Sequence, residues 1–145
     1  MCDYEPICEF ENQQELDNVL HWWQEKLFLQ DWIISAKIVS HNEFDLEDSC
    51  GENILTFESK TAVIHLLDMN LYPKDSPVKY CQEKVLVHEL LHCKYNFIQS
   101  TDSYSERYLD CIEHQRLEEM AKTLIMAKYD IPLDWFINDQ VSTSD

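Results

Sequence analysis

The chain has 145 residues, of which 45% are hydrophobic, so it can fold as one domain around a core of its own. Its 28 acidic and 11 basic residues give a formal net charge of −17. This charge disfavours direct nucleic-acid binding, which needs clustered Lys and Arg to neutralise phosphates, but it allows a cationic protein partner. No apolar run approaches the length of a bilayer span, so the sequence predicts no membrane partner.

The cysteines show no CxxC pair and no regular spacing, and no basic and apolar signal region begins the chain. They are Cys2, Cys8, Cys50, Cys81, Cys93 and Cys111. Reduced thiols are the simplest account, and they predict a cytoplasmic location.

The first helix is predicted over residues 12–28. Asn12 followed by Glu15 has the form of a capping box, and apolar residues including Trp23 then recur at helical spacing. Because Trp23 lies on that apolar stripe, we expect it in the core rather than in a ligand site. Residues 1–11 show no period and are expected to form a less ordered arm.

Three strands are predicted next. Residues 32–39 alternate with a period of two, and residues 54–66 form two apolar runs around a turn at 58–60, which is typical of a hairpin. An acidic loop over 41–52, with the only glycine of the chain at Gly51, joins these strands. The result is a small, mostly antiparallel sheet of three strands.

Two long helices complete the predicted α+β fold. The first covers about 77–98, with Ser76 able to cap it, and is apolar on two opposite sides, so we expect it between the sheet and a later helix. The later helix covers about 105–129. Residues 133–137 could fold back as a short capping segment, and 138–145 are expected to be a less ordered tail.

The first of these helices contains the sequence HELLH, an HExxH motif. His88 and His92 are four residues apart, so on a helix they lie on one face and can bind one metal ion. Glu89 falls beside them, where its carboxylate would contact a water rather than the ion. This arrangement indicates two ligands and a general base of a catalytic zinc site, and the apolar flanks would bury it.

A catalytic zinc takes three protein ligands, so the helix over 105–129 must supply one. With Leu117 as the centre of its inward stripe, Glu113 lies about 40° and His114 about 60° to either side. Glu118 lies about 100° away, and Glu119 faces solvent and is excluded. His114 and Glu118 are four residues apart, so whichever binds the ion could be oriented by the other.

Three segments carry a resemblance to a known family: LQDW at 29–32, VHELLH at 87–92 and HQRLEEMA at 114–121. Over most of its length the chain resembles small phage- and prophage-encoded metallopeptidases, which are similar to the ImmA/IrrE group of zincins. In that group a glutamate ligand begins the downstream motif, at the position of His114. Three histidine ligands resemble the SprT-like zincins instead, so we take His114 as the third ligand, with Glu118 and Glu113 as alternatives.

The sequence therefore predicts a single minimal zincin-like domain over 1–145 that acts as a Zn²⁺-dependent peptidase. Glu89 would take a proton from the attacking water and return it to the leaving amine. The resemblance implies a narrow intracellular protein target in the cytoplasm of a host cell, such as a repressor or a host-defence protein. The hairpin 54–66 is the candidate for aligning the substrate by backbone pairing. Candidate hydroxyls for the oxyanion are Tyr95, Tyr104 and Tyr108.

The charge of −17 keeps a hypothesis of another class open. In it the chain is a zinc-stabilised acidic protein that imitates nucleic acid and inhibits a nucleic-acid-binding partner, with little or no catalysis. Replacing Glu89 separates the two hypotheses, because only the peptidase needs that carboxylate.

Overall fold

The computed structural model describes residues 4–40, 50–95 and 103–138, with side chains from residue 110 onward in the last range. The helices are α1 (Gln13–Lys26), α2 (Gln82–Lys94) and α3 (Ser103–Tyr129), and the short 3₁₀ helices are η2 (Met69–Leu71) and η3 (Leu133–Phe136). The strands are β1 (Ile33–Val39), β2 (Gly51–Thr56) and β3 (Thr61–Leu67). The coarse α+β class is as predicted.

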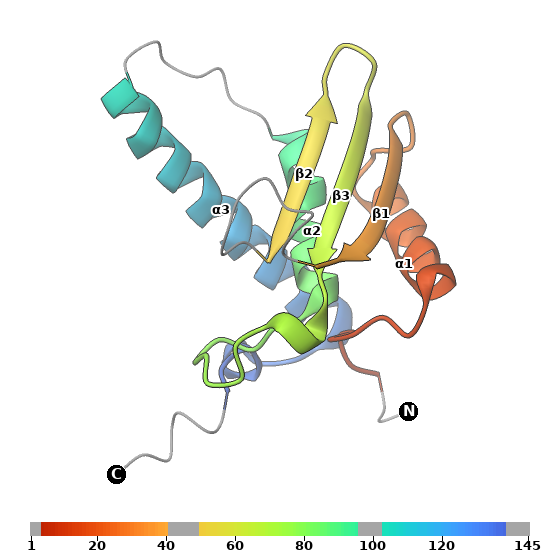
Figure 1. Ribbon diagram of the computed structural model, residues 1–145, viewed down its shortest axis with the longest axis vertical. Helices are drawn as coiled ribbons and strands as arrows, with labels where there is room; N and C mark the ends of the chain where they lie inside the picture. Colours follow the sequence, from red (N-terminus) through yellow and green to blue (C-terminus); the bar gives the residue numbers. More distant parts are fainter. Residues whose placement is uncertain (1–3, 41–49, 96–102, 139–145) are drawn as a thin grey trace.

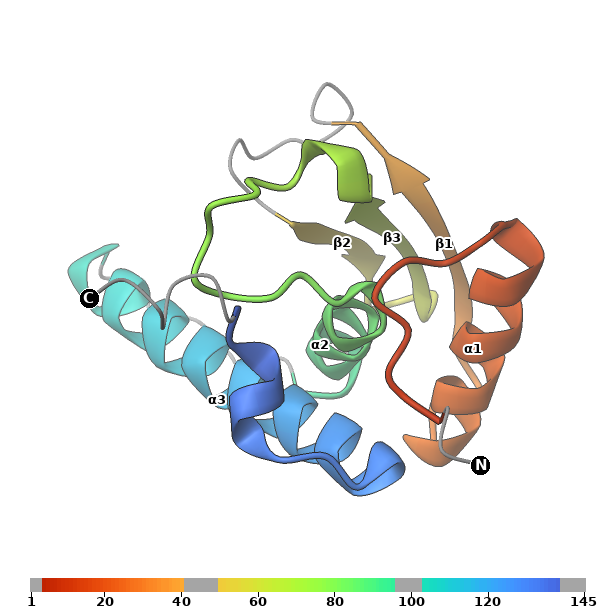
Figure 2. The same ribbon diagram turned by 90° about the horizontal axis from the view of Figure 1, so that it is seen from below.

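The sheet lies on a layer of helices. Helices α1 and α2 cover one face of the sheet, and α3 packs on the side of α2 that is turned away from it (Figure 1, Figure 2). Helix α2 is therefore enclosed between the sheet and α3, as its two apolar sides predict, and Leu86, Leu90 and Leu91 are at most 1% exposed. This burial is what holds the HExxH segment in a fixed orientation.

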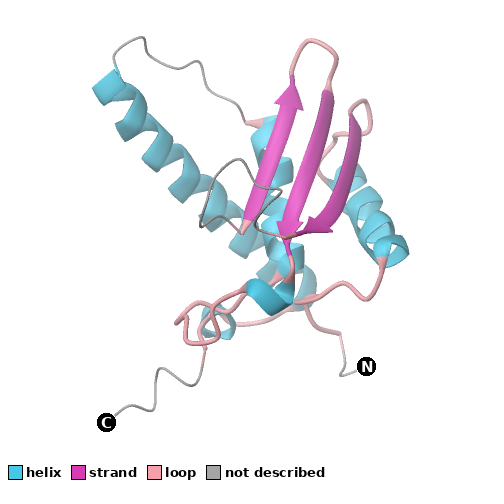
Figure 3. Cartoon of the chain, viewed as in Figure 1, coloured by secondary structure: helices cyan, strands magenta, loops and turns pink. Residues whose placement is uncertain are grey.

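The sheet is mixed, so the prediction of a mostly antiparallel sheet is wrong. Its order is β1-β3-β2, with β3 in the middle (Figure 3). The hairpin is antiparallel, with Gly51 opposite Leu66, but β1 runs parallel to β3, with Ile33 opposite Thr61. Two parallel strands cannot be joined by a tight turn, and here the chain returns along the sheet as β2, antiparallel to β3, before β3 begins. Of the predicted acidic loop, residues 41–49 lie outside the described residues.

Helix α1 begins as predicted. The Asn12 side chain accepts the Glu15 N–H at 2.8 Å, and the Glu15 carboxylate reaches back to the N–H of Glu11. Trp23 is 2% exposed and belongs to the core. The predicted end at residue 28 is two residues too long, because Phe28 takes a φ of 60° and reverses the chain.

Helix α2 begins at Gln82, not near Pro77, so the predicted cap by Ser76 is wrong. Residues 77–80 are not helical, and Val78 forms an antiparallel bridge with Ile137 just after η3. Lys79 N–H donates to the Phe136 carbonyl at 2.8 Å. The predicted end near residue 98 is also wrong, because α2 ends at Lys94 and the backbone of Tyr95, its C-cap, is no longer helical.

The N-terminal arm completes the first turn of α2. No side chain caps this helix, and the N–H groups of Gln82 and Glu83 donate to the carbonyls of Cys8 and Ile7, both at 3.0 Å. Phe10 is buried in the same region, and its N–H donates to the Gln82 side chain at 2.8 Å. The described part of the predicted arm is thus packed against α2.

Candidate metal centre

Three imidazoles meet where α2 and α3 cross. His88 and His92 point from α2 toward α3, and His114 of α3 points back at them. The ring centroids lie 5.1 Å apart for His88 and His92, 5.8 Å for His88 and His114, and 4.9 Å for His92 and His114. One ring nitrogen from each lies within 4.8 Å of the other two. The structure therefore brings together the two HExxH histidines and the first choice for the third ligand.

The carboxylate alternatives for the third ligand contact imidazoles instead. Glu118 Oε1 lies 2.9 Å from His88 Nδ1, a hydrogen-bond distance. Glu113 is buried, and its Oε1 lies 3.7 Å from His92 Nδ1, too far for a hydrogen bond. The expectation that Glu118 pairs with His114 is therefore corrected, because α3 turns Glu118 toward His88 on the neighbouring helix.

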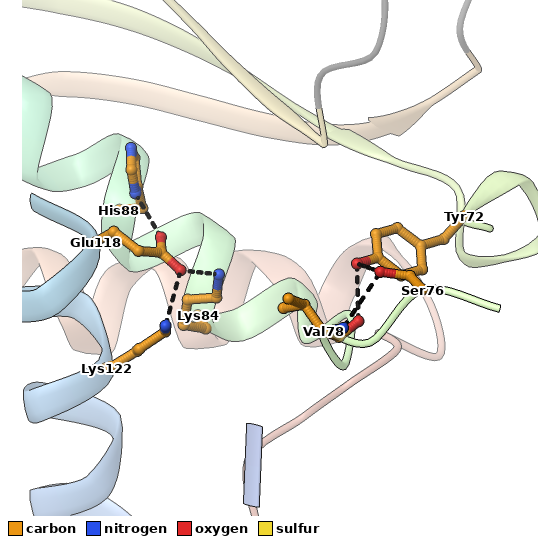
Figure 4. Close-up of polar contacts among 7 residues, drawn as sticks. All are labelled: Tyr72, Ser76, Val78, Lys84, His88, Glu118 and Lys122. Atoms are coloured by element: carbon orange, nitrogen blue, oxygen red, sulfur yellow. Dashed lines mark hydrogen bonds and ion pairs between the residues drawn. The ribbon is translucent and has the colours of Figure 1, made fainter. Parts of the chain in front are cut away.

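Glu118 also forms an ion pair with Lys84 (Figure 4). Its Oε2 lies 2.5 Å from Lys84 Nζ and 3.9 Å from Lys122 Nζ. Burial alone would raise the pKa of Glu118, but the hydrogen bond with His88 and the charge of Lys84 lower it to about 2. Glu118 is therefore ionised at neutral pH and acts only as a hydrogen-bond acceptor.

Glu89 lies in the same pocket and is 7% exposed. Burial raises the pKa of its carboxyl to about 7, against the lowering effect of the neighbouring His88. A carboxyl with a pKa near neutrality is suited to proton transfer in both directions. Its backbone is also held, because Asn53 Nδ2 of β2 donates to the Glu89 carbonyl at 2.7 Å.

The pocket has a volume of about 220 Å³ and opens between β2 and the two helices. Its wall is formed by Cys50, Gly51, Lys84, Val85, His88, Glu89, His114 and Glu118. Burial and the neighbouring imidazoles of His88 and His114 lower the pKa of His92, the remaining histidine of α2, to about 4. It is therefore neutral at pH 7, which is the form that binds a metal.

Gly51 brings the start of β2 against Glu89. A Cβ at this position would collide with Val85 Cγ1 and lie 3.0 Å from Glu89 Oε2. We therefore expect Gly51→Ala to push β2 away from α2 and to lower the free energy of unfolding by about 1 to 3 kcal/mol, the usual cost of overpacking. Urea unfolding measures this, with Thr56→Ala, exposed at the far end of β2, as the control. Equal stability of the two variants would contradict the close packing.

The donor set suits a zinc ion. Three neutral imidazole nitrogens are a common protein ligand set for catalytic zinc, and Glu89 lies beside the three histidines without being one of the ligands.

The sequence analysis did not identify Lys84 as part of the site, although a signal was present: Lys84 precedes His88 by four residues and so lies on the same face of α2. It also placed Gly51 in a loop, whereas the glycine begins β2.

Other predicted features lie around this centre. Cys81 and Cys93 are buried, and Cys93 Sγ accepts a hydrogen bond from Asn53 Nδ2 of β2 at 3.3 Å. Tyr95 is 39% exposed at the end of α2. The side chains of Tyr104 and Tyr108 lie outside the described residues.

Comparisons of the chain with protein-family models, with curated proteins and with solved structures find no match. The resemblance to phage metallopeptidases and to zincins therefore remains an expectation from three short segments. Among the described residues, no helix combines the length and the apolar character needed to cross a membrane.

Proposed function

We propose that this protein is a zinc-dependent peptidase. The observation that supports it best is the convergence of His88, His92 and His114 on one point beside the buried carboxyl of Glu89. A structural metal site would need neither an adjacent general base nor an open pocket. Here both are present, since Glu89 and two of the histidines line the same cavity.

The three histidines would hold a Zn²⁺ ion, which when bound lowers the pKa of a water and polarises a substrate carbonyl. Glu89 accepts a proton from the attacking water and delivers it to the nitrogen of the leaving amine. Asn53 holds the backbone of Glu89, so the carboxylate stays beside the histidines.

Strand β2 is suited to align an extended substrate, because it is the edge of the sheet next to the pocket. Leu67 N–H donates to the Cys50 carbonyl, so in this antiparallel pair the backbone groups of Gly51, Asn53 and Leu55 point away from β3. A peptide could pair with these groups as an added strand. We propose a protein segment in extended conformation as the substrate, in a narrow target such as a repressor or a host-defence protein.

Glu89→Gln is the variant that tests the peptidase. Purified wild type and variant are assayed for bound zinc and then incubated with a bacterial cell extract, in which new protein N-termini are counted by mass spectrometry. We expect stoichiometric zinc in both, and cleavage reduced by about a hundredfold or more in the variant, the usual contribution of a general base.

Two results would contradict the proposal. Absence of zinc from both proteins, after purification without chelators, would remove the metal site. If both bind zinc and act alike on a nucleic-acid-binding protein, the acidic inhibitor suggested by the charge of −17 becomes the better account.

A further inference from the structure

Lys84 is a buried cation in the wall of the pocket. It lies one turn before His88 on α2, and its side chain is 9% exposed. A buried ammonium group is costly unless it is paired, and the partner here is Glu118 Oε2 at 2.5 Å. The pair joins α2 to α3 directly beside the three histidines.

The hydrogen bond between Glu118 and His88 determines where the imidazole carries its proton. The Glu118 carboxylate can only accept, so His88 Nδ1 must donate to it. The lone pair of the neutral ring is then on Nε2, at the end of the ring turned away from Glu118 (Figure 4). In water a neutral histidine favours the opposite tautomer, so this arrangement depends on the carboxylate.

Both oxygens of Glu118 are thereby engaged, one by His88 and one by Lys84. Without Lys84 the second oxygen would be available to an ion in the pocket, since Glu118 lies in its wall. A carboxylate beside a metal can bind the ion itself or accept a hydrogen bond from another ligand. By occupying the second oxygen, Lys84 keeps Glu118 as the hydrogen-bond acceptor of His88 and prevents it from binding the ion.

We propose that Lys84 and Glu118 are a positioning pair: Glu118 fixes the tautomer and ring orientation of His88, and Lys84 keeps Glu118 in that role. This inference rests on the proposed zinc site for its purpose, but the tautomer belongs to the metal-free protein. Outer carboxylates of this kind typically contribute 10- to 100-fold to metal affinity. A pair that only fastened α2 to α3 would change stability and leave the tautomer and the intrinsic zinc affinity unchanged.

The first measurement is the tautomer of His88, from the ¹⁵N chemical shifts of the ring in metal-free protein at pH 8. We expect the proton on Nδ1 in the wild type and a shift toward Nε2 in Glu118→Leu. Glu118→Gln should restore the wild-type pattern in large part, because its amide oxygen can still accept. An unchanged ring in Glu118→Leu, with the fold intact by circular dichroism, would overturn the proposal.

The second measurement is the zinc dissociation constant by competition with a chromophoric chelator. It should rise by about 10- to 100-fold in Glu118→Leu and by about tenfold in Lys84→Met. Two controls should stay within about twofold of the wild type: Glu119→Gln, an exposed neighbour on α3, and Lys122→Met, whose ammonium lies 3.9 Å from Glu118. If Glu118→Leu and Lys84→Met bind as tightly as the controls, the pair has no positioning role.

The two measurements separate this inference from the proposed function. If the wild type binds no zinc, the peptidase fails, and the tautomer of His88 still decides whether Glu118 positions the ring. If the wild type binds zinc and the tautomer does not respond to Glu118, the metal site stands and the positioning pair fails.

Discussion

Replacing Glu83 with glutamine is expected to lower the free energy of unfolding by about 3 to 5 kcal/mol, the usual cost of breaking a buried ion pair from one side. Glu83 is fully buried at the start of α2. Its carboxylate accepts from Ile7 N–H at 3.0 Å, Trp23 Nε1 at 2.8 Å, Lys128 Nζ at 2.7 Å and Tyr129 OH at 2.6 Å. A glutamine would present its own N–H groups to two of these donors and would leave Lys128 buried without an anion.

Urea unfolding followed by tryptophan fluorescence measures this effect, since Trp23 is one of the donors. Glu119→Gln makes the same chemical change at an exposed position of α3 and is expected to stay within about 0.5 kcal/mol of the wild type. Lys128→Met, alone and combined with Glu83→Gln, completes a double-mutant cycle. A loss below about 1 kcal/mol for Glu83→Gln would show that the four hydrogen bonds do not hold the arm, α1 and α3 to α2.

The sequence offered no sign of this role for Glu83. A glutamate in the first turn of a helix is normally a solvated residue near the positive end of the helix dipole. Its burial follows from three segments that are distant in the chain, around Ile7, Trp23 and Lys128, and meet at this point only in the folded structure. The local sequence pattern does not indicate which distant segments will pack against each other.

His114→Ala is expected to weaken zinc binding by about a thousandfold. Structural zinc sites bind with about 10 to 16 kcal/mol, so one ligand among three or four contributes roughly 3 to 5 kcal/mol. The same loss should appear in thermal unfolding, because zinc at a thousand times its dissociation constant stabilises the folded wild type by about 4 kcal/mol. The variant should show no such gain at that concentration. Calorimetric titration and the zinc-dependent shift of Tm provide the two measurements.

Glu113→Gln is the matched control for His114→Ala, because Glu113 was an alternative third ligand and lies beside His92. It should retain zinc with a dissociation constant within about tenfold of the wild type, as expected for a group outside the ligand set. If Glu113→Gln loses zinc and His114→Ala keeps it, the ligand assignment is reversed.

The candidate site could be predicted in part because the HExxH spacing fixes two histidines and a glutamate on one helix without any knowledge of the fold. The partner of Glu118 could not, because it depends on how α3 is rotated about its axis where it crosses α2. His114 and Glu118 are four residues apart and so lie only about 40° apart around α3, and a small rotation of the helix therefore decides which of them faces which imidazole of α2. In the structure both reach it, the histidine toward the other imidazoles and the glutamate toward His88.

In the fold, too, the features that depend on neighbouring residues could be predicted, and those that depend on distant residues could not. The helix cap at Asn12 and the hairpin of β2 and β3 depend on neighbours in the chain, and both are present. The parallel pairing of β1 with β3 and the late start of α2 depend on distant partners. Val78 forms a bridge with Ile137, and nothing near residue 78 in the sequence indicates that strand-like bridge.

Because the N-terminal arm caps α2, the arrangement of the three histidines depends on segments that are synthesised at different times. The carbonyls of Ile7 and Cys8 leave the ribosome long before the N–H groups of Gln82 and Glu83 that they satisfy, and His114 follows later still. The three histidines can therefore adopt this arrangement only after the segment that contains His114 has been synthesised. A metal ion that needs all three imidazoles could therefore be captured only after α3 has packed against α2.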